Sequence, residues 1–507
     1  MWQIMNIKRA KQEIKDTIEA YLLKDRYGAY EIPAIRQRPV LLIGPPGVGK
    51  TQIMEQISQE CQIGLVAYTI THHTRQSAIG LPFIQEKIYN ARRVSVTEYT
   101  MSEIVASIYD KIESTGLREG ILFIDEINCV SETLAPTMLQ FLQCKTFGTH
   151  AIPEGWIIVA AGNPPEYNKS VREFDVVTLD RIKMIHVEPD YQVWKEYAEQ
   201  VQIHPAIRTY LDIKPGNFCR IETTVDGKRF ATPRGWEDLS RFLEVYEKLG
   251  KTADRDVISQ YIQYPQIAKD FANYLELYQK YQKDYQVDEI LNGVIREEAC
   301  RKLEKAPFDE RLSVISLLTA KLNDGFLALS MMEDRLERLQ KLLGGVKPGN
   351  YDEQEYPSAL ERLEGILAGV QAEWKYKKEA GLLDRKEAHL TFDTVETLDA
   401  LVKELRAEHI TETDAVWEKV SQAFADKNDQ YEVQFDLCGE QLEHAFDFME
   451  AAFGQSQEMV VFITSLNMGF YSVRFLGEYE CERYYRYNQT LLFDGQEKEI
   501  LEKIEKK

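Results

Sequence analysis

The most constraining feature of the sequence is the stretch GPPGVGKT, which directly follows the apolar run PVLLI and precedes the helical pattern QIMEQISQE. It fits G-x-x-x-x-G-K-[ST], and the order strand, glycine-rich loop, helix argues against a chance turn. In such a loop, backbone N–H groups and a helix N-terminus surround phosphate groups, while the lysine reaches the β- and γ-phosphates and the threonine binds Mg²⁺. The candidate phosphate-binding residues are Gly44, Pro45, Pro46, Gly47, Val48, Gly49, Lys50 and Thr51.

The fold class follows from the apolar runs around this loop. Between about residue 39 and 190, helical patterns alternate with PVLLIG, GLVAYTIT, GILFIDE, GWIIVAAG and KMIHVEP. Continuous rather than alternating apolarity is typical of strands covered on both faces, as in parallel α/β sheets. We therefore predict a P-loop α/β domain with helices on both faces of a parallel sheet. After Pro189 the strand signals fade, and we expect the remainder to be mainly helical.

Composition limits the classes of partner. The formal charge of -21 is concentrated beyond residue 190, where 41 Lys and Arg face 59 Asp and Glu, against 20 and 23 before it. Such acidity disfavours a nucleic-acid track, because phosphate contacts supply most of the affinity there. The charged start MWQIMNIKRAKQEIKD predicts no signal peptide, and we expect no apolar run to cross a membrane. We expect a cytoplasmic protein, whose seven scattered cysteines would be reduced.

Two carboxylates end the apolar strand ILFIDE, about 75 residues after the loop. Asp125 is placed to bind Mg²⁺, and Glu126 to orient and activate an attacking water. The alternative is a pair of solvated acids or a cap for the segment INCVSET. A second carboxylate favours hydrolysis over nucleotide storage.

An amide ends another buried strand, IIVAAGNPP. Asn163 before two prolines is typical of a turn, since proline cannot donate to a sheet. On a strand beside the other two, its amide would also point at the γ-phosphate and hold the lytic water with Glu126. These two interpretations are compatible.

The ordered set GPPGVGKT, FIDE, AAGNP, VTLDRI and TPRGW resembles the AAA+ ATPases, and within them the MoxR branch, over roughly residues 30 to 250. Relatives in that branch include the ATPase subunit of magnesium chelatase and helper ATPases of rubisco activation and nitric-oxide reductase assembly. The resemblance implies Mg²⁺-dependent ATP hydrolysis. It also implies an α/β nucleotide-binding domain over residues 1–190 and a helical lid over 191–290, which leaves a mainly helical domain of unassigned role over 291–507.

The resemblance also implies roles for three further polar residues. Asn163 would be the first sensor and Arg234 the second, contacting nucleotide from the lid. Arg181 would be the arginine finger in a neighbouring subunit's site. Alternatives stay open: Arg181 paired with Asp180, Arg172 as the finger, or Arg234 as a helix cap. The stretch YNKS at 167–170 is not the guanine-reading N-K-x-D, which favours ATP.

A finger acting in trans requires a ring, and the resemblance implies a hexamer. It also implies two extra hairpins, which LPFIQEKIYNARRVSVTEY and KTFGTHAIP would form, turning near Asn90 and Gly148. Arg92, Arg93, Phe147 and His150 are candidates to face the pore or a partner, and the alternative for each is a scattered surface residue.

The function predicted on this basis is an ATP-driven ring that remodels, matures or assembles a client protein, with a partner carrying a von Willebrand factor A domain. One alternative is a nucleic-acid-stimulated AAA+ motor. The other is a slow nucleotide switch or signalling scaffold.

Overall fold

The computed structural model describes residues 4–72, 80–90, 92–147, 150–167, 174–224, 227–350, 356 and 358–489. The chain divides into two compact units. The first unit comprises residues 1–193 together with 371–388, and the second comprises 194–370 and 389–507. The subdivision of the helical part into a lid and a C-terminal domain stays a prediction.

A six-stranded sheet forms the centre of the first unit, in the order β1-β10-β2-β9-β6-β3. All five neighbouring pairs are parallel. The strands are β1 (Ile4–Met5), β2 (Val40–Ile43), β3 (Gly64–Thr69), β6 (Gly120–Asp125), β9 (Trp156–Gly162) and β10 (Lys183–Val187). The predicted parallel α/β fold is therefore confirmed. The two-residue β1 was not predicted, because it is too short to leave a pattern.

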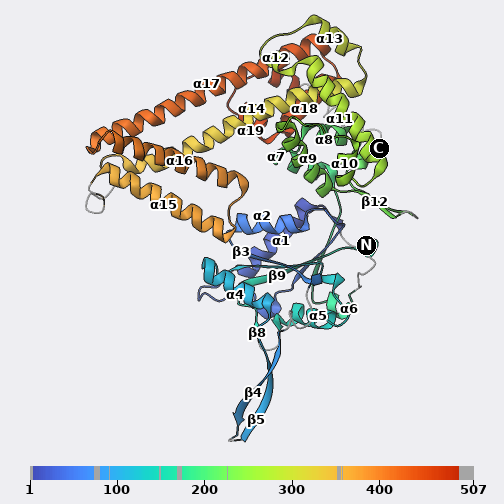
Figure 1. Ribbon diagram of the computed structural model, residues 1–507, viewed down its shortest axis with the longest axis vertical. Coiled ribbons are helices and arrows are strands. Elements are labelled where there is room, and N and C mark those ends of the chain that lie inside the picture. The colour runs from blue at the N-terminus through green and yellow to red at the C-terminus, as the bar shows by residue number, and fades with distance from the viewer. Residues whose placement is uncertain are drawn as a thin grey trace, which may run out of the picture. The chain divides into compact units, whose positions relative to one another are not determined.

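Helices cover both faces of this sheet (Figure 1). Residues alternate between the two faces along each strand: Leu122 and Ile124 of β6 join the core under α4 (Glu103–Thr115) and α5 (Ala135–Cys144). Ile121 and Phe123 join the opposite core, under α1 (Ile7–Leu22) and α2 (Lys50–Cys61). Burial on both faces explains why the strands read as continuous apolar runs.

Helix α4 begins directly after Ser102, which caps it. The Ser102 Oγ accepts a hydrogen bond from the Val105 N–H, and Gly116 ends the helix with a left-handed backbone at φ 72°. Serine at the N-cap and glycine at the C-terminal end are both common at helix termini.

Both predicted hairpins are present. Strands β4 (Pro82–Tyr89) and β5 (Arg92–Tyr99) pair antiparallel and extend beyond the sheet (Figure 1). The second hairpin pairs β7 (Thr146–Phe147) with β8 (His150–Ala151), and its expected turn at Gly148 lies outside the described residues. Phe147 does not face outward as suggested. It is 1% exposed and stacks on Phe141, because an aromatic ring gains more free energy in the core than at a hairpin tip.

A distant segment of the chain completes the first unit. Residues 371–388 join the end of α15 (Ala359–Ala380) to the start of α16 (Arg385–Ala407). The Lys111 ammonium donates to the Ala380 carbonyl (2.7 Å), and the Tyr376 hydroxyl donates to the Thr115 carbonyl (3.0 Å). Burial lowers the Lys111 pKa. The tip of this helical hairpin is thus hydrogen-bonded to α4. No sequence pattern predicts this contact.

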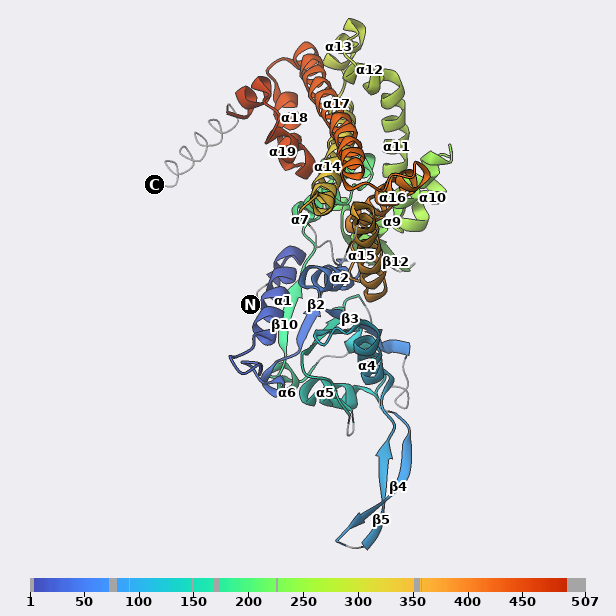
Figure 2. The same ribbon diagram turned by 90° about the vertical axis from the view of Figure 1, so that its left-hand side faces the viewer.

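The second unit is mainly helical, as expected. Its helices are α7 (Tyr191–Gln200, which begins in the first unit), α8 (Pro205–Ile213), α9 (Pro233–Lys248), α10 (Arg255–Tyr261), α11 (Pro265–Tyr285), α12 (Val287–Leu291), α13 (Glu297–Glu304), α14 (Phe308–Leu343), α17 (Thr413–Phe453), α18 (Gln457–Met468) and α19 (Phe470–Leu476), together with most of α15 and α16. The long α17 runs beside α14 (Figure 2). A small hairpin, β11 (Arg220–Thr224) with β12 (Gly227–Ala231), was not predicted, since its strands are polar.

Helix α14 bears on the expectation that no segment could cross a membrane. The segment Phe308–Val346 has the length and mean hydropathy, 1.4 in its best window, of a membrane span, and 56% of that window is buried inside the structure. The core helix of a helical domain passes the same test. The bent pair α18 and α19 also passes as a broken span. The cytoplasmic location stays a prediction. All seven cysteines are free, as expected.

The packing of Trp156 at the start of β9 gives a stability prediction. Its indole lies against Gly120 so closely that a Cβ there would be 2.7 Å from both a ring carbon and the Gly64 carbonyl oxygen. We expect Gly120→Ala to destabilise the fold by about 1–3 kcal/mol through overpacking. The measurement is the denaturant midpoint. Gly369→Ala on α15, where a Cβ meets no atom within 4 Å, is the matched control, and equal midpoints for the two variants would contradict the packing account.

Candidate active site

The phosphate-binding loop lies where the sequence places it, between β2 and α2. Gly47 and Gly49 have positive φ angles of 77° and 98°, which glycine adopts without the strain that a Cβ brings. A Cβ on Gly44 would lie 2.7 Å from the Val187 carbonyl oxygen. Gly49 precedes α2 and makes no side-chain cap, so the first N–H groups of the helix face the loop. This backbone suits a bound phosphate chain.

Lys50 and Asn163 converge beside this loop. The Lys50 ammonium donates to the carbonyls of Gly44 (2.7 Å) and Pro45 (2.9 Å) and to the Asn163 Oδ1 (3.1 Å). Lys50 is only 8% exposed, whereas Asn163 is half-buried. A cation from the start of α2 and an amide from the end of β9 therefore meet at one point, as expected for a γ-phosphate site.

Thr51 and Asp125 form a second contact across the sheet edge. The Thr51 hydroxyl donates to Asp125 Oδ2 (3.1 Å). Two oxygen ligands at this spacing fit Mg²⁺, which prefers oxygen and usually keeps water and phosphate oxygens as its other ligands. No cluster of three or more His, Cys, Asp or Glu able to hold a metal occurs in the described ranges, and Mg²⁺ bound in this way needs none. Held by Thr51 and Asp125, Mg²⁺ would supply positive charge that stabilises the negative charge developing on the phosphate.

Glu126 has a strained backbone. Its φ and ψ are 56° and 33°, a left-handed conformation that non-glycine residues adopt at a cost of about 1–2 kcal/mol. Its N–H is bonded to Asp125 Oδ1 (2.8 Å). Strain of this kind persists where the surroundings hold it, often at active sites. The turn sends the chain sharply away from β6, and Glu126 caps no helix with its side chain.

Asn128 is a site residue that sequence reasoning missed. It lies in the short 3-10 turn Ile127–Cys129, is 4% exposed, and its Nδ2 donates to the Asn163 carbonyl (2.8 Å). No periodicity or spacing singles out an asparagine two residues after the paired acids. Only the adjacency of β6 and β9 reveals its partner.

Arg181 lies on the surface of the same unit. It is exposed, follows α6 (Val176–Leu179), and donates to Gln143 Oε1 (2.5 Å). Among the described residues it forms no ion pair with Asp180 and no bond to Lys50 or Glu126. The alternative finger, Arg172, lies outside the described residues.

Arg234 belongs to the second unit. It is exposed in the first turn of α9, where Thr232 supplies the cap by accepting from the Gly235 N–H (3.2 Å). Arg234 is therefore not the helix cap that the sequence left as an alternative.

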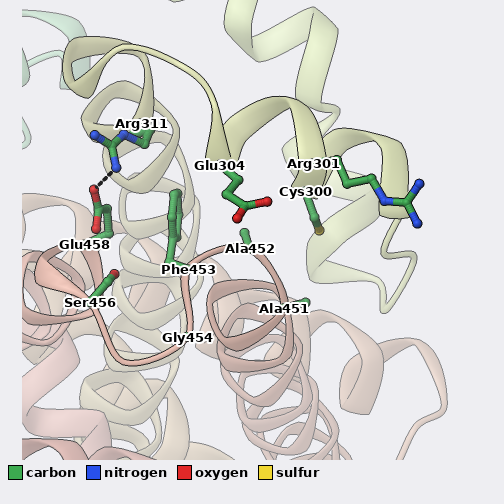
Figure 3. Close-up of a pocket in the computed structure, with 10 residues that line it drawn as sticks. All are labelled: Cys300, Arg301, Glu304, Arg311, Ala451, Ala452, Phe453, Gly454, Ser456 and Glu458. Atoms are coloured by element: carbon green, nitrogen blue, oxygen red, sulfur yellow. Dashed lines mark hydrogen bonds and ion pairs between the residues drawn. The ribbon is translucent and has the colours of Figure 1, made fainter.

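The second unit also contains a cavity of about 330 Å³ between α13, the start of α14, the end of α17 and the start of α18 (Figure 3). Its charged lining includes Arg311, which donates to Glu458 (2.5 Å), and Glu304. Cations and carboxylates balance in this lining, and its residues include none of the predicted site residues.

Taken together, the contacts at the sheet edge suit phosphoryl transfer to water. The loop backbone and Lys50 would hold phosphate oxygens, Thr51 and Asp125 would hold Mg²⁺, and Glu126 and Asn163 would hold the water. Such a site works by positioning and charge stabilisation.

Comparison with known proteins agrees with this geometry. Residues 39–182 match the family model of the AAA domain (dynein-related subfamily). The match begins just before β2, ends just after Arg181 and covers less than a third of the 507 residues. A comparison with curated proteins gives no match. The family model does not distinguish the MoxR branch within its subfamily. Residues 39–182 are thus similar to AAA domains, and the geometry of the site agrees with that similarity.

Proposed function

We propose that this protein hydrolyses Mg²⁺-bound ATP as a ring of identical subunits and uses the cycle to remodel or assemble a client protein, in the manner of the MoxR branch. The observation that carries the proposal is the meeting of Lys50 with Asn163 beside the Thr51–Asp125 contact. These four side chains come from α2, β6 and the end of β9, and each has a separate task in ATP hydrolysis.

The ring is inferred from the position of Arg181. Arg181 is exposed and, among the described residues, is bonded to Gln143 rather than to its own chain's site. An arginine in that position would complete a neighbour's site in trans, and such a finger stabilises the charge of the transition state. AAA+ domains usually form rings, and we expect a hexamer.

The client is proposed to be a protein because of the charge and the exposed hairpin. The excess of acid beyond residue 190 disfavours nucleic acid. The hairpin β4–β5 exposes Ile84 (76%) and Ile88 (69%), apolar side chains typical of protein contacts. A partner with a von Willebrand factor A domain remains an expectation from the MoxR resemblance.

The general base gives the first prediction. We expect Glu126→Gln to lower ATP turnover about 10²–10⁴-fold, the usual contribution of a positioned base, while Mg²⁺–ATP binding persists. The measurement is phosphate release at saturating ATP, beside a nucleotide titration. Glu113→Gln, at an exposed position on α4, is the matched control. Turnover equal to wild type in Glu126→Gln would remove the glutamate from the mechanism.

The finger gives the second prediction. We expect Arg181→Ala to assemble normally, measured by light scattering with ATP, yet to lose about 10³-fold or more in turnover, whereas the exposed Arg118→Ala keeps it. Mixing Arg181→Ala with Glu126→Gln should restore part of the activity, because mixed rings contain sites with both residues intact. A monomer whose specific turnover is independent of concentration and indifferent to Arg181 would instead favour the slow switch.

A further inference from the structure

Asn128 links the ends of two strands that carry the site. Its Nδ2 donates to the Asn163 carbonyl (2.8 Å), and its Oδ1 lies so close to Gly162 that a Cβ there would be only 2.5 Å away. The side chain is 4% exposed. Asn128 therefore packs against the last residue of β9 and bonds the first residue after it.

The backbone at this point lies at the end of the β9 ladder, where the Gly162 carbonyl accepts from the Gly44 N–H (3.3 Å) and the Pro164 carbonyl accepts from the Tyr167 N–H (3.1 Å). The paired residues of β9 end at Gly162, opposite Ile43, so the Asn163 carbonyl lies beyond the ladder. Pro164 and Pro165 follow and bring no N–H group. The left-handed turn at Glu126 redirects the chain and places Asn128 beside β9. The strained turn and the Asn128 bond thus belong to one arrangement.

We infer that Asn128 is a positioning residue for ATP hydrolysis, which holds Asn163 against Lys50. It acts through the Asn163 backbone, and the Asn163 Oδ1 in turn accepts from the Lys50 ammonium at 3.1 Å. The inference rests on the proposed function, in which Asn163 holds the water. It assigns Asn128 an effect on turnover rather than on nucleotide affinity, since the loop backbone and Thr51 bind nucleotide without it.

The test uses the full chain and an isosteric change. Asn128→Asp keeps the shape but replaces the donor with a carboxylate facing a carbonyl oxygen, so the bond is lost at pH values where the aspartate is ionised. We expect kcat to fall about 10-fold to 10²-fold, the size of effect that a misplaced reacting group produces, with the Kd for an ATP analogue within about 2-fold of wild type. The matched control is Asn350→Asp in the second unit. It removes the same kind of hydrogen bond, from the Asn350 side-chain amide to the Gly344 carbonyl.

Two further variants keep the test decisive. Asn128→Ala covers the case in which the buried aspartate prevents folding. Gly162→Ala leaves Asn128 intact and displaces its side chain, so it should give the same kinetic change. In an Asn163→Ala background, Asn128→Ala should cost no further turnover, because both act through the same amide. Unchanged kcat, or a full additional loss in that background, would overturn the inference.

Amide hydrogen exchange separates this inference from the proposed function. In Asn128→Ala with bound Mg²⁺–ADP, we expect faster exchange in the segment that contains Asn163 and not in β3. If the wild type does not hydrolyse ATP, the proposed function fails, and faster exchange alone supports the positioning of Asn163. Unchanged exchange in that segment overturns the inference, whether or not the wild type is active.

Discussion

The parallel pairing of β2, β9 and β6 is the constraint on which the site depends. Parallel neighbours bring their carboxyl ends to one edge of a sheet, so the P-loop, Asn163 and the two acids emerge side by side although they are far apart in sequence. Burial of both faces fixes the register of these strands. The core that stabilises the sheet thus also sets the distances between the polar groups at its edge.

The site combines a buried, hydrogen-bonded lysine with a strained backbone at Glu126. Lys50 is buried, and its ammonium donates to two carbonyls of its own loop, so few other side-chain conformations are open to it. Glu126 stays in a left-handed conformation that costs free energy, next to a side chain, Asn128, that is almost fully buried. Preorganised donors and acceptors of this type account for much of the rate enhancement in phosphoryl transfer.

The sequence predicts the site well where polar residues directly follow an apolar strand pattern. GPPGVGKT, the acids after ILFI and the amide after IIVAAG each lie at the end of an apolar run, so their convergence follows from a parallel sheet. The Asn128 bond could not be predicted, because it depends on the turn at Glu126 and on the register of β9. The docking of residues 371–388 onto α4 depends on tertiary contacts between segments over 250 residues apart. The proposed role of Arg181 depends on a neighbouring subunit, and that of Arg234 depends on the position of the second unit. The sequence pattern of one chain predicts neither.

The central claim, that the edge of the β2–β9–β6 sheet is a nucleotide site organised by Lys50, is tested most directly by calorimetric titration of Mg²⁺–ATP into the full chain. The account predicts saturable binding of one nucleotide per chain, lost or greatly weakened in Lys50→Ala and weakened when Mg²⁺ is removed from the wild type. No binding by the folded wild-type protein, or equal binding by Lys50→Ala, would contradict it.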